Sequence, residues 1–295
     1  MKHFGICPGS CGEFIQGMLE DSEYLVSYAV NMYSKAQVEE KSENIRKGPY
    51  KARKALQEVF KYFNLDVKDT KNISLNVKSN IPIGKGMASS TADIGATINA
   101  ALSFLGKELD SHKISKIAAK VEPTDSIFIE NNCIFNPLKG EVLKELGYVD
   151  GIKVLVLEPN EKLNTQSIRR KQDYFLKKQD NKEKIKQAFK TLEEGFKNND
   201  LKLIGKAATI SSILNENIHK KDGLHEIIKI TEEFGAYGVN IAHSGTVIGI
   251  ILDKEMNHKK LEEKLILRKL NKKYKKIYSL DVIRGGVRGG ELWNI

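Results

Sequence analysis

A glycine-containing loop between a predicted strand and a predicted helix constrains the fold of this chain more than any other feature. Residues 81–93 follow the run 72–78, in which apolar residues alternate as in a half-buried strand. They lead into 88–105, where alanine and aliphatic residues predict a largely buried helix. Gly84 and Gly86 let the backbone approach a ligand closely, and a helix N-terminus attracts anions. The arrangement therefore predicts a phosphate-binding loop.

Two widespread glycine motifs do not fit this loop. The Walker pattern needs a glycine, four residues and then Gly-Lys-Ser/Thr, and the order here is different. In the dinucleotide fingerprint the third glycine would fall at Ser89, and no acidic residue ends a second strand about 20 residues later. A purely structural alternative is that Ser90 and Asp93 form a variant capping box at the start of the helix. The loop alone leaves both interpretations open.

The length of 295 residues suggests two domains at roughly 150 residues each. The character of the chain changes after the apolar run 152–157, because lysine, glutamate, glutamine and asparagine dominate 160–199, with an apolar stripe from Ile185 to Phe196. We therefore expect domains over 1–150 and 151–295. Strands and then helices in each half predict an α+β fold. Hydrophobic periodicity also predicts strands over 24–39, 127–129, 134–135, 237–242, 246–252 and 276–282, and helices over 51–63, 112–121, 201–214, 224–234 and 258–270.

Composition narrows the function classes. The chain has 48 lysines and arginines against 38 acidic residues, a net charge of +10, but glutamates lie between the lysines and no zinc-finger or aromatic RNA-binding motif occurs. We expect a solvated basic surface and no nucleic-acid partner. Without a long apolar run or a secretory signal, we expect no membrane partner and a cytoplasmic location. The three cysteines, Cys7, Cys11 and Cys133, are expected to be reduced thiols and not zinc ligands.

The loop resembles the Pro-x-x-x-Gly-Leu-x-Ser-Ser-x-Ala motif of the GHMP kinases, named for galactokinase, homoserine kinase, mevalonate kinase and phosphomevalonate kinase. The matching residues are Pro82, Gly86, Met87 in place of leucine, Ser89, Ser90 and Ala92. Residues 7–17 are similar to the first motif of the family, which lines the substrate site. Residues 242–249 resemble its third motif, a glycine turn that helps to close the phosphate site. Three motifs in the family's order are far more specific than any one of them.

This resemblance implies a two-domain GHMP kinase-like fold, with the nucleotide and substrate site between the domains, and a need for ATP and Mg²⁺. Within the family, residues 8–17, 84–93 and 122–126 most resemble the branch that phosphorylates L-threonine to O-phospho-L-threonine, a precursor of the aminopropanol linker of cobalamin. Homoserine is the nearest alternative substrate. A non-catalytic ATP-binding regulator is the alternative from another class. A monomer and a homodimer are both compatible with the sequence.

The resemblance also implies roles for individual residues. Ser90 and Glu122 would hold the metal, and Asp125 would act as base or orient the substrate hydroxyl. Glu122 and Asp125 are closer in sequence than in mevalonate kinase-like members, and the structural alternatives are an exposed helix-end charge and an Asx turn. The loop residues expected to bind ATP are Pro82, Gly84, Lys85, Gly86, Met87, Ala88, Ser89 and Ser90.

An amino-acid substrate needs a partner for its ammonium group and donors for its carboxylate. Glu13 is the expected ammonium partner, and Arg284 or Arg288 is a candidate for the carboxylate. The adjacent His243 and Ser244 do not indicate a serine hydrolase, because the Gly-x-Ser-x-Gly elbow is missing. We expect His243 to be structural or to lie near the nucleotide. The remaining residues predicted to line the substrate pocket are Gln16, Ser27, Tyr28 and Gly245.

Overall fold

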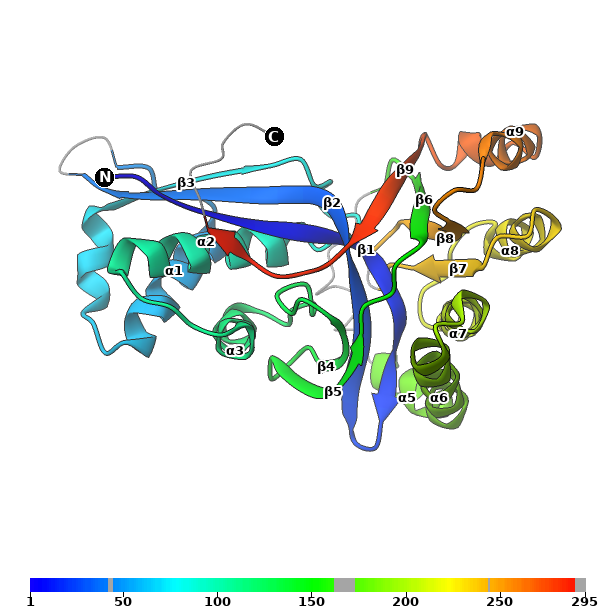
Figure 1. The fold of residues 1–295 in the computed structure, drawn as a ribbon, viewed down its shortest axis with the longest axis horizontal. Helices are drawn as coiled ribbons and strands as arrows, with labels where there is room; N and C mark the ends of the chain where they lie inside the picture. The colour runs from blue at the N-terminus through cyan, green and yellow to red at the C-terminus, as the bar shows by residue number, and fades with distance from the viewer. Residues whose placement is uncertain (42–44, 162–172, 244, 290–295) are drawn as a thin grey trace.

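The computed structural model describes residues 1–41, 45–161, 173–243 and 245–289. Within them, ten strands of different lengths form one antiparallel sheet. Helices pack against this sheet, which is an α+β arrangement (Figure 1). The strands are β1 (His3–Leu19), β2 (Ser22–Glu40), β3 (Ile73–Ser79), β4 (Asn132–Asn136), β5 (Glu141–Gly147), β6 (Ile152–Glu158), β7 (Gly238–Ile241), β8 (Ile248–Asp253), β9 (Lys276–Ile283) and β10 (Arg288–Gly289).

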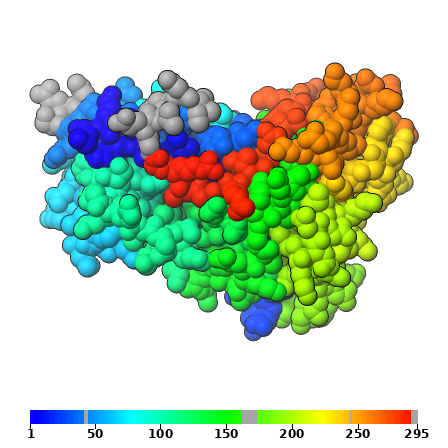
Figure 2. Space-filling view, in the orientation of Figure 1, coloured from blue at the N-terminus to red at the C-terminus, as the bar shows by residue number. Residues whose placement is uncertain are grey.

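The long hairpin of β1 and β2 joins the two halves of the molecule. Its strands pair with each other, and each also pairs with a strand from the C-terminal half, β1 with β7 and β2 with β9. Strand β7 pairs with β8, β8 with β6, and β6 with β9, so the pairings among the described strands form a closed ring that starts and ends at the hairpin. The tip of the hairpin protrudes from the lower edge of the molecule in Figures 1 and 2. The hairpin therefore brings N-terminal and C-terminal residues together.

Helices cover the sheet in two groups. Helices α1, α2 and α3 lie under the first part of the hairpin and β3 (Figure 1). In the second group, α7 and α8 contact β7, α6 packs on α7 and β1, and α9 packs on α8. Helix α2 approaches β1 so closely that a Cβ on Gly5 would lie 2.1 Å from the Ala96 carbonyl oxygen. The helices are α1 (Tyr50–Tyr62), α2 (Ser89–Leu105), α3 (Ser111–Val121), α5 (Tyr174–Asp180), α6 (Lys182–Asn198), α7 (Leu201–Leu214), α8 (Leu224–Glu233) and α9 (Lys259–Leu267), with 3₁₀ turns at Val67–Asn72 and Leu270–Lys272.

The main hydrophobic core draws on both halves of the chain. Phe14 of β1, Phe128 and Phe189 of α6 belong to the same buried cluster. A second cluster lies between β6, β7 and β8 and helices α8 and α9. The sheet continues across the expected boundary near Gly151, and the division into 1–150 and 151–295 stays a prediction. None of the helices described here combines the length and apolar character needed to cross a bilayer.

The periodicity located most elements within a few residues, and the differences include the following three. The predicted strand 127–129 is wrong: this stretch forms turns, and the Ile129 N–H donates to the Ser126 carbonyl at 2.9 Å. Strand β1 was not predicted, because Pro8 and its glycines obscure the alternation and bulges interrupt its register with β2. Strand β5 was not predicted either, because it is mostly exposed and carries lysine and glutamate.

Candidate active site

The three motifs meet through their backbones. The N–H of Thr246 in the third motif donates to the Lys85 carbonyl of the glycine loop at 2.8 Å. The N–H of Ser10 in the first motif donates to the Met87 carbonyl at 3.1 Å. A Cβ on Gly12 would lie 2.5 Å from the Ile241 carbonyl oxygen, so the first motif also touches the strand that leads into the third. Only glycine permits the last of these approaches.

The glycine loop leaves the N-terminus of α2 without a side-chain cap. Gly84, Gly86 and Ala88 have φ of +73°, +83° and +58°, in the left-handed region, and Ala88 occupies the N-cap position. The capping-box alternative is therefore wrong, and Ser90 and Asp93 bond to other parts of the chain. Backbone N–H groups at the start of a helix are then available for an anion. The loop has the local geometry of a phosphate-binding site.

Lys85, predicted to bind ATP, is buried beneath the loop. Its ammonium group donates to the carbonyl oxygen of Glu161 at 2.6 Å and also to that of Pro159. In this arrangement its side chain ties the glycine loop to the segment after β6. Its contribution to phosphate binding stays a prediction.

The two predicted metal-binding residues lie together. The Ser90 hydroxyl donates to Glu122, at the C-terminal end of α3, and the Lys51 ammonium group of α1 contacts the other Glu122 oxygen at 2.5 Å. Asp93, one turn beyond Ser90, accepts a hydrogen bond from Ser34 at 2.5 Å. Burial raises the pKa of Asp93, and the negative charge of Glu122 raises it further. The cluster thus concentrates oxygen atoms and negative charge beside the phosphate loop.

These residues fit a bound Mg²⁺. Hydroxyl and carboxylate oxygens are the ligands that Mg²⁺ prefers, and the ion usually takes only one or two protein ligands beside phosphates and water. The Lys51 ammonium group pairs with one Glu122 oxygen, so a metal ion would share this carboxylate with Lys51 or displace it.

Asp125 lies on a loop that is fixed at several points. The Thr124 N–H donates to the Pro137 carbonyl at 3.0 Å. On the other side, Gly285 and Gly286, which follow β9, donate their N–H groups to the carbonyls of Glu130 and Ile127 at 3.0 and 2.8 Å. The segment that follows β9 runs along the surface in red in Figure 2. The C-terminal turn therefore positions the loop that carries Asp125.

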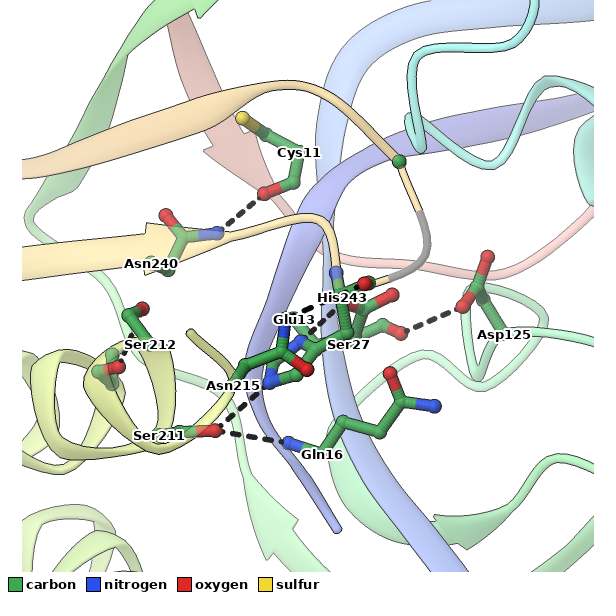
Figure 3. Close-up of polar contacts among 12 residues, drawn as sticks. Cys11, Glu13, Gln16, Ser27, Asp125, Ser211, Ser212, Asn215, Asn240 and His243 are labelled. Carbon is green, nitrogen blue, oxygen red and sulfur yellow. Dashed lines mark hydrogen bonds and ion pairs between the residues drawn. The ribbon is translucent and has the colours of Figure 1, made fainter. Parts of the chain in front are cut away.

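Ser27 connects Asp125 with Glu13. The Ser27 hydroxyl donates to Asp125 Oδ1 at 3.4 Å, and Ser27 is the cross-strand partner of Glu13 in the β1–β2 register (Figure 3). Side chains of directly paired residues lie on the same face of a sheet. The candidate hydroxyl-activating group and the candidate ammonium partner therefore share one face of the hairpin.

Glu13 is buried and bonded to His243. Its Oε2 accepts hydrogen bonds from the His243 backbone N–H at 3.2 Å and from the ring Nδ1 at 2.9 Å. Burial raises the pKa of Glu13 to about 7, an effect opposed by the His243 N–H and by Lys178 and Lys221. Burial holds the pKa of His243 well below its usual value and lowers that of Lys221 to about 7. The imidazole is therefore neutral beside the carboxylate.

The other predicted substrate residues differ in position. Gln16 is buried, and its amide donates to Glu23, while Gly245 packs against the glycine loop. Tyr28 points away from Ser27, because successive residues of a strand face opposite sides. Its hydroxyl oxygen lies 2.9 Å from the Cys11 carbonyl oxygen and 2.8 Å from Asn240 Oδ1, two acceptors for its single hydrogen, so its polar group is held inside the fold.

The two candidate arginines lie outside this cluster. Arg284 donates to Asn131 Oδ1 at 2.7 Å and stacks over the Tyr148 ring at 4.4 Å. Arg288 pairs with Ile6 on β1, seven residues before Glu13, which is about 20 Å along a strand. Neither position supports the suggested contact with the substrate carboxylate. Ser244 lies outside the described residues.

Sequence reasoning missed several residues of the site. Lys51 lies in a predicted helix, and Ser34, Ser211 and Lys221 belong to none of the three motifs. Each contacts a motif residue more than 20 positions away, and no local pattern reports such a pairing. Asp93 lies inside the glycine-loop motif, and its position there was the one sequence signal that pointed to a further polar residue of the site.

Comparisons with known proteins identify the family of the chain. Residues 49–129 match the GHMP kinases N terminal domain, and residues 192–276 match the GHMP kinases C terminal family. The chain is 33% identical to an L-threonine kinase of Salmonella typhimurium strain LT2, over 96% of this chain and 94% of that protein. It is 32% identical to an L-threonine kinase of Citrobacter freundii, over 95% and 97%. A homoserine kinase structure from Cytophaga hutchinsonii superimposes with a TM-score of 0.66 at 15% identity, covering 98% and 97%, and shares the fold.

Proposed function

The chain belongs to the GHMP kinase family of phosphotransferases, and from that premise we propose that it is an L-threonine kinase, which transfers the γ-phosphoryl group of ATP to the hydroxyl of L-threonine. The observation that carries this proposal is the identity of about a third with two L-threonine kinases over nearly the full length. The arrangement of Glu13, Ser27 and Asp125 on one face supports it, because an amino acid with a hydroxyl group needs one partner at each end.

In the proposed reaction, the glycine loop and the N-terminus of α2 bind the phosphates of ATP. Ser90 and Glu122 would hold Mg²⁺, which would neutralise phosphate charge when bound. Glu13 binds the substrate ammonium group and thereby orients the hydroxyl. Asp125 accepts the hydroxyl proton as the substrate oxygen bonds to the γ-phosphorus and the bond to the bridging β–γ oxygen breaks. ADP and O-phospho-L-threonine are the products.

We place this reaction in the cytoplasm, where it would supply O-phospho-L-threonine for the aminopropanol linker of cobalamin. ATP and the amino acid are the proposed partners, without nucleic acid or membrane. Both a monomer and a homodimer are compatible with this role. The proposal for the pathway rests on the similarity to the L-threonine kinase branch.

The test is Mg²⁺-dependent ADP release with L-threonine, L-homoserine, L-serine and mevalonate offered separately, with the phosphorylated product identified by mass spectrometry. We expect release to favour L-threonine and the product to be O-phospho-L-threonine. Preference for homoserine or mevalonate would overturn the substrate while leaving the phosphotransferase chemistry. No release with any of the four would overturn the proposed function.

A further inference from the structure

A chain of buried hydrogen bonds leads from helix α7 to Glu13. The Gln16 backbone N–H bonds to Ser211 Oγ at 3.3 Å, Ser211 Oγ lies 3.0 Å from His243 Nε2, and His243 Nδ1 lies 2.9 Å from Glu13 Oε2 (Figure 3). The exposed fractions of Ser211, His243 and Glu13 are 1%, 4% and 7%. We call Ser211, His243 and Glu13 the relay.

The direction of these bonds follows when Glu13 is ionised and His243 is neutral, because a carboxylate can only accept. With His243 neutral, Nδ1–H donates to the carboxylate, and Nε2 accepts from the Ser211 hydroxyl. The Ser211 oxygen in turn accepts from the Gln16 N–H, so every donor in the chain points toward Glu13. A neutral donor orients a carboxylate without bringing a full positive charge to it, which leaves the carboxylate able to bind a cation.

Both bonds from His243 end on the same oxygen of Glu13, Oε2. A carboxylate held at one oxygen by two donors has a fixed plane, and its second oxygen then has a fixed direction. The cross-strand pairing with Ser27 places this group on the face that also carries Asp125. Figure 3 places Ser211 on one side of Glu13 and Asp125 on the other.

We propose that Ser211 and His243 are positioning residues which hold the Glu13 carboxylate for the ammonium group of the substrate, so that the relay sets the preference for α-amino-acid substrates. This inference rests on the proposed function. Among the described residues, the hydrogen bonds of the relay side chains join them to Gln16 and to one another, and not to the glycine loop that precedes α2. Disturbing the relay should weaken binding of the amino acid without weakening binding of the nucleotide.

The experiment compares steady-state kinetics of the full-length wild type with Ser211→Ala, His243→Ala and His243→Asn. We expect KM for L-threonine to rise about tenfold in His243→Ala, which loses a hydrogen bond to a charged group, and by roughly two- to tenfold in Ser211→Ala, which loses a bond between neutral groups. KM for ATP should change by less than about twofold. His243→Asn should recover much of the loss relative to His243→Ala, because its amide can donate to Glu13 in place of Nδ1.

Ser212→Ala is the matched control. Ser212 is the next residue on α7, is equally buried, and bonds to the Ala208 and Val239 carbonyls at 2.9 and 3.1 Å (Figure 3). A general effect of altering buried α7 serines would therefore appear in this variant too. Thermal unfolding of every variant separates loss of fold from loss of positioning, and Ser211→Ala, which removes a single oxygen, carries the test if the histidine variants unfold.

Three outcomes would overturn the relay: Ser211→Ala matching Ser212→Ala in KM for L-threonine, KM for ATP rising in parallel with it, or His243→Asn being as impaired as His243→Ala. If the proposed function is wrong, a different result is expected: the wild type itself would produce no phosphothreonine. The two failures are therefore distinguishable in one set of assays.

Discussion

Gly86 and Gly245 touch through their backbones, although 159 positions separate them in the chain. A Cβ on Gly245 would lie 2.4 Å from Gly86 Cα and 2.3 Å from the Lys85 carbonyl oxygen. A Cβ on Gly86 would lie 2.8 Å from Gly245 Cα. This contact holds the phosphate loop of the N-terminal half against the turn of the C-terminal half.

We expect Gly245→Ala to displace the phosphate loop. The added methyl group meets backbone atoms that cannot move independently, so the free energy of unfolding should fall by ~1–3 kcal/mol and KM for ATP should rise. Chemical denaturation and ADP-release kinetics measure the two effects. Gly289→Ala is the control, because its nearest neighbour would be Asn99 Oδ1 at 3.8 Å. Equal behaviour of the two variants would contradict the tight contact.

Asp125→Asn should abolish most turnover while ATP still binds. The amide keeps an oxygen that can accept from Ser27 but cannot take the hydroxyl proton, so kcat should fall by about 10²–10⁴-fold. Product formation and KM for ATP are the measurements. Asp69→Asn, at an exposed position, controls for loss of a surface charge. A kcat near that of the wild type would remove Asp125 from the proposed mechanism.

Glu122→Gln should raise the Mg²⁺ concentration that gives half-maximal activity. Loss of a residue that orients a metal ligand costs about 10–100-fold in metal affinity, and loss of the ligand itself should cost at least about tenfold. The rate is measured against Mg²⁺ concentration at saturating ATP and L-threonine. The exposed Glu108→Gln is the control. An unchanged Mg²⁺ dependence would count against Glu122 as a ligand.

The KM for L-threonine should rise as the pH falls from about 8 to about 6. Burial raises the pKa of Glu13 to about 7, so acid protonates the carboxylate and removes the charge that attracts the ammonium group. Lys178, Lys221 and Glu23 are the charged groups that act on Glu13.

KM for ATP, measured over the same range, controls for titration of the nucleotide. Glu13→Gln should have a high KM for L-threonine that varies little with pH. A KM that rises equally in wild type and Glu13→Gln would mean that another group titrates.

Local residue patterns were enough to predict much of the fold. Apolar alternation gave β3, apolar composition gave β6 and α2, helical periodicity gave α1 and α3, and glycine placement gave the phosphate loop. These features depend on neighbours within a few positions, where backbone preferences and amphipathicity act. Strand β1 was missed because both of its faces are buried, so its sequence does not alternate between apolar and polar residues.

Motif order also indicated Ser90, Glu122 and Asp125, and the structure places Ser90 with Glu122 and Asp125 with Ser27. Their chemical roles stay predictions. The linkage of Glu13 to His243 and Ser211, the burial of Lys85 and the remote position of Arg288 could not be deduced from the chain alone. Such pairings join residues far apart in sequence, and only the register of the sheet and the packing of α7 decide them, because burial and hydrogen-bond partners are properties of the assembled fold.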